Sequence, residues 1–215
     1  VFPCAVLFAL MLNEVRNMRF KKTVQMVSYA PHFISTVVIV SILQCFFQRS
    51  NGLVNNVLEL MGKERVDFLN LPHLFSTMYV WSGVWQNVGW DAIIYIAALA
   101  GVSLDLIEAA KIDGANRLQI VLHVNIPHIL PTIVTLLILR TGSVLSVGFE
   151  KIFLMQTPLN LEASRVLSTY VYEMGNQNSR LDYSTAVGLF NNVVNVVVLI
   201  LVNTVAKKVS KIGLF

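Results

Sequence analysis

The chain has 215 residues, of which 55% are hydrophobic and only 13% are charged, and its mean hydropathy is +0.66. These values lie outside the usual range of soluble domains and indicate that much of the chain is surrounded by lipid. The net charge is +4, and basic loops of a membrane protein account for it, so no nucleic-acid partner is implied.

Five apolar stretches are candidates for membrane-spanning helices, each of which needs about 20 mostly apolar residues. The opening stretch, VFPCAVLFALML, is too short to span alone, so we expect it to be the end of a span cut by N-terminal truncation. At least one more helix is then expected upstream. The other expected spans, in chain order, are His32–Gln48, Phe75–Ala100, His128–Phe149 and Tyr183–Ala206. The sequence therefore predicts an all-α membrane protein, a bundle of five transmembrane helices with the first partial, as one domain over residues 1–215.

The orientation follows from the positions of Lys and Arg, because short cytoplasmic loops are enriched in these residues. Alternating spans divide the loops into two sets. The set that contains residues 13–31, 101–127 and the C-terminus has more basic than acidic residues, whereas the other set does not. We therefore expect the C-terminus to be cytoplasmic and the two longer loops, about residues 49–74 and 150–182, to lie outside.

Two charged residues fall within expected spans, where insertion scales give a cost of about 2.5–3.5 kcal/mol for each. Asp91 lies in the third span and Arg140 in the fourth. If these spans meet the cytoplasm near Leu99 and Leu130, both side chains lie about 12–15 Å into the membrane. The shared depth predicts that the two groups meet each other or share a polar cavity, as a structural pair rather than as solute ligands.

A more polar segment, residues 103–127, separates the third and fourth spans. Ser103 is a good N-cap residue, and Asp105 falls in the first turn, where the helix dipole favours an acid. Gly114 stands where a chain that leaves a helix needs left-handed backbone angles. A second amphipathic helical pattern begins at Ala115, and Pro127 is expected to begin the next span. The segment should therefore be a helix, a glycine corner and a second helix at the cytoplasmic surface.

The periodicity of this segment leaves two interpretations open. It is either an interfacial amphipathic helix that rests on lipid, or an element that docks into a groove of a cytosolic partner. The small side chains of Ala109 and Ala110 would permit close contact with such a partner.

The motif Glu-Ala-Ala, three residues, Gly, nine residues and VNIP resembles the EAA loop of permease subunits of ATP-binding-cassette (ABC) importers. Asp113–Ala115, "DGA", is similar to the carbohydrate branch of that family, and the resemblance extends to WQNVGWDAIIYIAALAGV and RTGSVLSVGFEKIFLMQTP elsewhere in the chain. Val124 departs from the isoleucine that is commoner in the motif. The motif residues are Glu108, Ala109, Ala110, Gly114, Val124, Ile126 and Pro127.

This resemblance implies the type I importer permease fold and a division of labour between subunits. In the family, the EAA loop is a coupling helix that sits in a cleft of a separate ATPase, and two ATPases drive two permeases that receive solute from an extracytoplasmic binding protein. The permease itself binds no cofactor, and ATP with Mg²⁺ is held by the ATPase; the chain accordingly has no GxxxxGK[ST] loop. The residues that the resemblance assigns to ATPase coupling are Glu108, Ala109, Ala110, Asp113, Gly114 and Ala115.

A carbohydrate pathway needs amide donors and acceptors beside aromatic faces. Asn191 and Asn195 are four residues apart and so share one face of the last span, although amides there also serve to bond neighbouring helices. The full set of pathway candidates, including the charged pair, is Trp85, Asn87, Asp91, Arg140, Phe149, Asn191 and Asn195, with Trp90 and Tyr183 beside them. Import of a non-sugar solute, or a membrane scaffold that recruits an unrelated cytosolic protein, are the alternatives.

Overall fold

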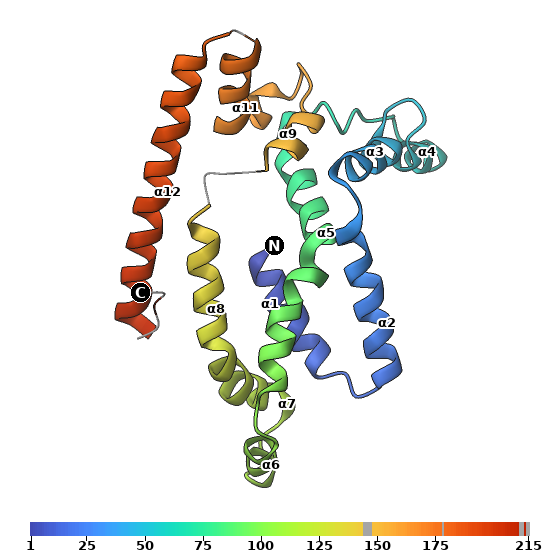
Figure 1. Cartoon of the computed structure of the whole chain (residues 1–215). Coiled ribbons are helices and arrows are strands. Elements are labelled where there is room, and N and C mark those ends of the chain that lie inside the picture. Colours follow the sequence, from blue (N-terminus) through green and yellow to red (C-terminus); the bar gives the residue numbers. More distant parts are fainter. Residues whose placement is uncertain (144–147, 178, 211–212, 214–215) are drawn as a thin grey trace. The chain divides into compact units, whose positions relative to one another are not determined.

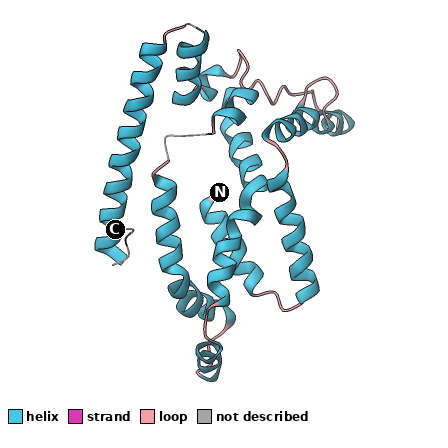
Figure 2. Ribbon diagram, viewed as in Figure 1, coloured by secondary structure: helices cyan, strands magenta, loops and turns pink. Residues whose placement is uncertain are grey.

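The computed structural model describes residues 1–143, 148–177, 179–210 and 213, and every regular element within these ranges is helical (Figure 2). The predicted all-α class is therefore confirmed. The longest helices are α5 and α12 (Figure 1). The elements in chain order are α1 Phe2–Asn13, α2 Met18–Tyr29, the 3₁₀ turn η1 Ala30–Phe33, α3 Thr36–Phe47, α4 Leu53–Leu60, α5 Pro72–Ala100, α6 Leu104–Ile112, α7 Arg117–Ile120, the π-helical turn η2 Val121–Asn125, α8 Ile126–Thr141, α9 Phe149–Met155, α10 Leu161–Ser164, α11 Leu167–Tyr172, the π-helical turn η3 Glu173–Gln177 and α12 Leu181–Ser210.

The chain forms two compact units, and α5 and α12 contribute to both. The first unit comprises Val1–Phe33, Val84–Gly142 and Val196–Phe215, and the second comprises Ile34–Gly83 and Ser143–Asn195. The first therefore holds α1, α2, the second half of α5 and α6 to α8. The second holds α3, α4, the first half of α5 and α9 to α11.

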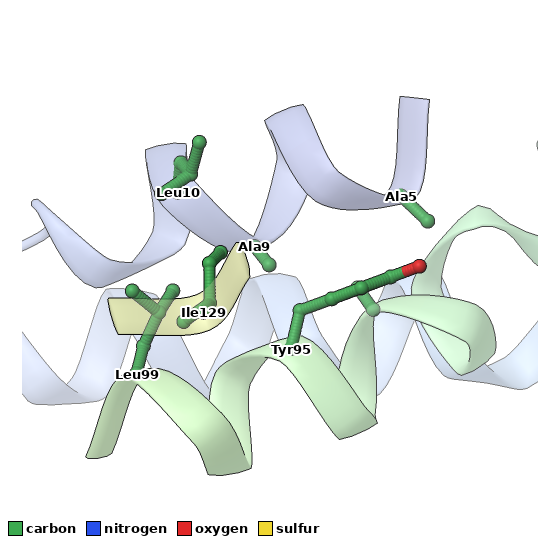
Figure 3. Close-up of a cluster of buried hydrophobic side chains, with 7 residues drawn as sticks. Ala5, Ala9, Leu10, Tyr95, Leu99 and Ile129 are labelled. Atoms are coloured by element: carbon green, nitrogen blue, oxygen red, sulfur yellow. The ribbon is translucent and has the colours of Figure 1, made fainter. Parts of the chain in front are cut away.

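The core of the first unit is built on small side chains of α1. Ala5 and Ala9 are fully buried and lie one turn apart, facing Tyr95 and Leu99 of α5, while Ile129 of α8 fills the remaining side (Figure 3). Alanine at this spacing lets two helix backbones approach closely, and small residues are enriched for this reason where membrane helices pack together.

A second close approach joins α2 to α5. Gly89 of α5 is buried, and a Cβ atom placed on it would overlap the backbone carbonyl of Ser28 in α2. Only glycine therefore permits this packing distance. Asn17 caps the other end of α2, because its side-chain oxygen accepts hydrogen bonds from the backbone N–H groups of Arg19 (3.0 Å) and Phe20 (3.2 Å).

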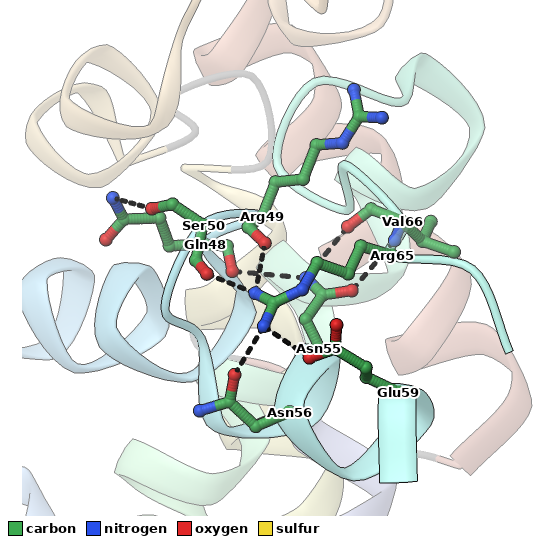
Figure 4. A network of polar contacts seen from close by, with 8 residues as sticks. All are labelled: Gln48, Arg49, Ser50, Asn55, Asn56, Glu59, Arg65 and Val66. Atoms are coloured by element: carbon green, nitrogen blue, oxygen red, sulfur yellow. Dashed lines mark hydrogen bonds and ion pairs between the residues drawn. The ribbon is translucent and has the colours of Figure 1, made fainter. Parts of the chain in front are cut away.

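The second unit has a smaller apolar core and a polar hairpin. Val40, Phe75, Ile152 and Met155, from α3, α5 and α9, form the core. The hairpin around α4 is closed by Asn55, which is fully buried (Figure 4). Its side chain makes three hydrogen bonds to the backbone. Nδ2 donates to the carbonyls of Gln48 (3.1 Å) and Val66 (2.9 Å), and Oδ1 accepts from the N–H of Val66 (2.8 Å).

Arg65 completes the hairpin. Its guanidinium donates to the carbonyls of Arg49 (3.0 Å) and Ser50, and it forms an ion pair with Glu59 at 2.7 Å (Figure 4). Backbone carbonyls that no helix satisfies are thus bonded by side chains, as buried or half-buried loops require.

The expected spans are met unevenly. Within the described residues, two helical runs are long and apolar enough to cross a membrane, Arg117–Thr141 and Leu181–Lys208, and two bent helix pairs qualify only if each pair is one span. The expected span His32–Gln48 is wrong as one helix, because η1 ends at Phe33 and Ser35 caps a new helix, α3. A 12-residue helix is about 18 Å long, which is well short of the roughly 30 Å apolar thickness of a bilayer. The count of five spans stays a prediction.

The expected span His128–Phe149 has different limits. Its helix runs unbroken from Arg117 and ends at Thr141, and residues 144–147 lie outside the described residues. Pro127 lies in the first turn of α8, as expected, but η2 joins α7 to α8 without a break, so the continuous helical run begins earlier, at Arg117. In η2 the N–H of Ile126 bonds to the carbonyl of Val121, five residues back, and such a widened turn is a common way for a helix to absorb an interruption.

Candidate functional site

The segment between α5 and α8 has the predicted form of a helix, a glycine corner and a second helix. Ser103 caps α6 by accepting a hydrogen bond from the N–H of Asp105 at 3.2 Å. At the other end, the N–H of Gly114 bonds to the carbonyl of Lys111 (3.1 Å) and that of Ala115 to Ala110 (2.9 Å). With φ of +81° at Gly114, this is a Schellman motif, in which glycine is strongly preferred.

The second helix of the corner is also fixed locally. Asn116 and Gln119 form a capping box: the Asn116 Oδ1 accepts from the Gln119 N–H (2.9 Å), and the Gln119 Oε1 accepts from the Asn116 N–H (2.7 Å). Ile120 is buried and anchors α7. The corner is therefore a defined elbow, here called the coupling elbow, residues 103–127, rather than a loose loop.

Both arms of the coupling elbow are joined directly to long helices. α5 and α6 meet at a bend of 73°, with only Gly101–Ser103 between them, and α7 continues through η2 into α8. A force applied to the coupling elbow is therefore transmitted to two long helices without a flexible linker.

The six predicted coupling residues all lie on or beside the outer surface of this elbow. Glu108, Ala109, Asp113 and Gly114 are exposed, whereas Ala110 and Ala115 are half-buried. A pocket of about 260 Å³ lies in the crook of the elbow. Its lining includes four of the six coupling residues and four others: Ala110, Asp113, Gly114, Ala115, Gln119, Ile120, His123 and Val124. The coupling role of these six residues stays a prediction.

Sequence reasoning missed the apolar part of this surface. Leu104 (73% exposed), Ile112 (86%) and Leu118 (66%) project from the coupling elbow. Exposed aliphatic side chains beside a charged residue are typical of a docking surface. Their spacing in the sequence is that of an ordinary amphipathic helix, so only the structure identifies which of them face outward.

The charged residues expected in the spans form an ion pair. Arg140 Nη2 of α8 lies 2.6 Å from Asp91 Oδ2 of α5, and the carboxyl side chain is 16% exposed whereas the guanidinium is 50% exposed. The pair borders a cavity of about 250 Å³ between α1, α5 and α8, whose aromatic lining comes from Phe2, Trp90 and Tyr95. The predicted proximity is thus present, and the role of the pair stays a prediction.

This ion pair yields a double-swap test. Exchanging one partner alone, Asp91→Arg or Arg140→Asp, is expected to destabilise the protein by about 1–3 kcal/mol, because it places like charges together. The cost stays in this range because the side chain at position 140 is half-exposed and solvent screens its charge. The double exchange should recover most of the lost thermal stability, measured on the protein purified in detergent. Equal melting temperatures for the double and single variants would show that the pairing does not stabilise the fold.

An aromatic cluster lies beside this cavity. The His32 ring stacks on Trp90 with centroids 4.5 Å apart and planes at 3°, and His32 Nδ1 lies 3.0 Å from the Asn87 Oδ1. Phe33 meets the edge of the same indole at 5.5 Å. Asn87 and Trp90 are therefore brought together through His32, whereas Trp85 is 49% exposed and takes no part in this cluster. His32 is 55 residues from Asn87 in sequence, so no local pattern indicates this contact.

The remaining pathway candidates lie in the second unit. The ring of Phe149 packs against Phe153 (5.4 Å) and Tyr172 (5.1 Å). Asn195 is buried, and Asn191 is half-buried with an Oδ1 that has no hydrogen-bond partner among the described residues, whereas Asn192 between them is exposed. The shared amide face is thus less exposed than Asn192, and its pathway role stays a prediction.

Three comparisons place this geometry among known proteins. The family model described as "Binding-protein-dependent transport system inner membrane component" matches residues 2–211. Protein LplB and the polygalacturonan/rhamnogalacturonan transport system permease protein YteP, both of Bacillus subtilis (strain 168), are each 41% identical over 214 residues, which cover 100% of this chain and 67% of theirs.

A solved structure agrees closely as well. The crystal structure of a bacterial alginate ABC transporter, in complex with an alginate pentasaccharide-bound periplasmic protein, contains a chain with a TM-score of 0.96 and 41% sequence identity. The match covers 99% of this chain and 74% of that chain. This chain therefore belongs to the family of inner membrane components of binding-protein-dependent transport systems.

Proposed function

We propose that this chain is the permease subunit of an ATP-driven importer of oligosaccharides or related carbohydrates. The observation that carries the proposal is the coupling elbow, which presents Glu108 and exposed aliphatic residues and is joined without a linker to α5 and α8. Such an element can transmit movement of a cytosolic subunit into the membrane, and it has no evident purpose in a static scaffold.

The carbohydrate assignment rests on the relatives. YteP is named for polygalacturonan and rhamnogalacturonan transport, and a solved neighbour imports the acidic polysaccharide alginate. Both are 41% identical to this chain, so oligosaccharides derived from polyuronates are the first candidates for its solute.

The chain itself hydrolyses nothing, since its relatives are permease subunits whose ATPase is a separate chain. In the proposed assembly it works beside a second permease, two ATPase subunits and an extracytoplasmic solute-binding protein. We further propose five spans in this stretch of the protein, with the coupling elbow and the C-terminus cytoplasmic, in agreement with the distribution of basic residues in the sequence.

The pathway is proposed to pass the largely apolar cavity that Trp90 lines and that the Asp91–Arg140 pair borders. At about 250 Å³ it is smaller than the roughly 300–1,000 Å³ of pockets that enclose whole ligands, so this subunit would supply only part of the pathway.

Reconstitution tests the proposal. The full-length permease, with its second permease, ATPases and binding protein in lipid vesicles, is expected to hydrolyse ATP faster when the binding protein carries an oligosaccharide. Labelled oligosaccharide should cross the membrane only when ATP is present, and it should accumulate on the side opposite to the binding protein. ATPase binding without either response would favour the scaffold.

A further inference from the structure

A polar pocket of about 560 Å³ lies within the second unit. It is formed by the connection between α3 and α4, the loop between α4 and α5, and the segment that follows α9. Its volume falls within the roughly 300–1,000 Å³ of pockets that bind small ligands. All of its lining residues except one leucine are polar or charged: Gln48, Arg49, Ser50, Arg65, Asp67, Leu69, Asn70 and Thr157. Such a lining suits a ligand that carries many polar groups.

One side of the pocket is fixed by hydrogen bonds to a buried amide. Asn160 is fully buried, its Nδ2 donates to the carbonyl of Leu69 (2.9 Å), and its Oδ1 accepts from the N–H of Thr157 (2.9 Å). The Thr157 Oγ1 donates to the Asn70 Oδ1 (2.7 Å), and the Asn70 Nδ2 donates to the Asp67 Oδ2 (2.9 Å). Segments 87 residues apart are thus joined without a ligand, and a site that is ordered in advance costs less entropy to occupy.

The two arginines of the pocket differ in what they already bond. The charge of Arg65 is engaged by the ion pair with Glu59 and by backbone carbonyls. The exposed guanidinium of Arg49 has no hydrogen-bond or ion-pair partner among the described residues, and its side chain extends away from the Arg65 network (Figure 4). The second carboxylate oxygen of Asp67, Oδ1, is likewise unbonded within the described part of the chain. The pocket therefore offers a cation and an acceptor that this subunit does not use.

This combination of groups discriminates between kinds of ligand. A carboxylate can accept two parallel hydrogen bonds from the Arg49 guanidinium, which makes the contact both strong and geometrically specific. A hydroxyl group can donate to Asp67, whereas a second carboxylate would be repelled by it. A neutral sugar would leave Arg49 unused, and an acidic peptide would leave Asp67 without a donor. A uronate carries one carboxylate and several hydroxyls on a single ring.

We propose that this pocket binds one uronate unit of an acidic oligosaccharide, with the carboxylate on Arg49 and a hydroxyl on Asp67. The inference rests on the proposed function and deepens it, because it gives an importer of acidic glycans a second site for its solute. The groups that bind the unit belong to the two loops, residues 49–74 and 150–182, that we propose to be extracytoplasmic. The solute would therefore meet this pocket before it enters the membrane.

Direct binding of a short probe tests the site without the solute-binding protein. The transporter, assembled with its ATPases and purified in detergent, is titrated with digalacturonate and with its dimethyl ester, which keeps the hydroxyls but carries no charge. Arg49→Met is expected to weaken binding of the acid about tenfold or more and to leave binding of the ester unchanged. Lys63→Met, which removes an exposed cation of the α4–α5 loop that does not line the pocket, is the matched control and should change neither.

Two results of this titration would overturn the inference. One is equal weakening of both probes by Arg49→Met, because a loss that ignores the charge of the ligand reports a change of structure. The other is digalacturonate binding that is absent from the wild type or unchanged in Arg49→Met, because the acid would then bind elsewhere or not at all.

Uptake into vesicles separates this site from the proposed function. In the complete reconstituted transporter, Arg49→Met should slow the uptake of oligogalacturonate at limiting solute, while uptake still requires ATP. A wild type that imports oligogalacturonate as fast as the variant would overturn the site and leave the proposed function standing. A wild type that imports only neutral oligosaccharides would have the same meaning. A wild type that imports no carbohydrate would overturn both.

An acidic side chain of the solute-binding protein is the competing occupant. Arg49→Met would then raise the concentration of binding protein that gives half-maximal ATPase stimulation, and digalacturonate binding to the isolated transporter would not change. That combination would assign the pocket to protein docking and overturn the inference. The expected result is the reverse: an unchanged half-maximal concentration together with weaker binding of digalacturonate.

Discussion

Glu108→Arg is expected to abolish ATP-driven uptake while the permease remains inserted in the membrane. Glu108 is exposed on α6, next to Ala109 and beside the 86%-exposed Ile112, so the reversed charge falls on the proposed docking surface and not on the protein interior. A charge placed against an unmatched partner at an interface costs about 2–5 kcal/mol, which corresponds to an association roughly 30-fold weaker or more. Copurification of the ATPase and uptake into vesicles measure both consequences.

The control for this prediction is Glu64→Arg. Glu64 is an exposed acid in the loop between α4 and α5, on the side of the membrane that we propose to be opposite to the coupling elbow. Its reversal changes the net charge equally but should leave ATPase copurification intact. If Glu108→Arg retained both the ATPase and the uptake of the wild type, the coupling role of this residue would be wrong.

Gly89→Ala is expected to destabilise the protein markedly although it adds only one methyl group. The added Cβ would overlap the carbonyl of Ser28, and because this is backbone, no side-chain rotation relieves it. Overpacking of this kind costs about 1–3 kcal/mol and occasionally more. Thermal unfolding of the detergent-purified protein, followed by intrinsic fluorescence, should show a clearly lower midpoint.

Gly188→Ala is the matched control, because it makes the same substitution in another long helix, α12. Apart from the backbone of α12 itself, no atom of the described residues lies within 4 Å of a Cβ placed at Gly188, so helix propensity is the main change. Alanine is favoured over glycine within a helix by about 0.5–1 kcal/mol, and the variant should be neutral or slightly more stable. Equal midpoints for the two variants would show that α2 and α5 do not pack closely at Gly89.

The coupling elbow could be predicted from the sequence because its signals are local. Ser103 and Gly114 are residue types whose caps act within a few positions, and both caps form as expected. The ion pair of Asp91 with Arg140 could be anticipated for a different reason. A charge within the membrane is costly unless it is paired, and two opposite charges at one depth are each other's nearest available partners.

Other features could not be predicted, because they depend on contacts distant in sequence. The stacking of His32 on Trp90 joins segments that no periodicity connects. Lys151 follows an acid in an expected loop, where a charged residue is ordinarily solvated, and only packing reveals its burial. The expected span His32–Gln48 fails because hydropathy reports composition but not the break that Ser35 introduces.

The widened turn η2 determines which way the coupling elbow faces. Ile120 before the turn and Ile129 after it are both buried, although residues nine apart on a regular helix lie about half a revolution from each other. One additional residue in the turn brings them to within about a quarter of a revolution, so that both reach the protein interior. Leu118 and Leu122 are consequently left on the outer surface. Loss of one residue from Val121–Asn125 would rotate the elbow about its axis and point Glu108 in a different direction from the one it now has.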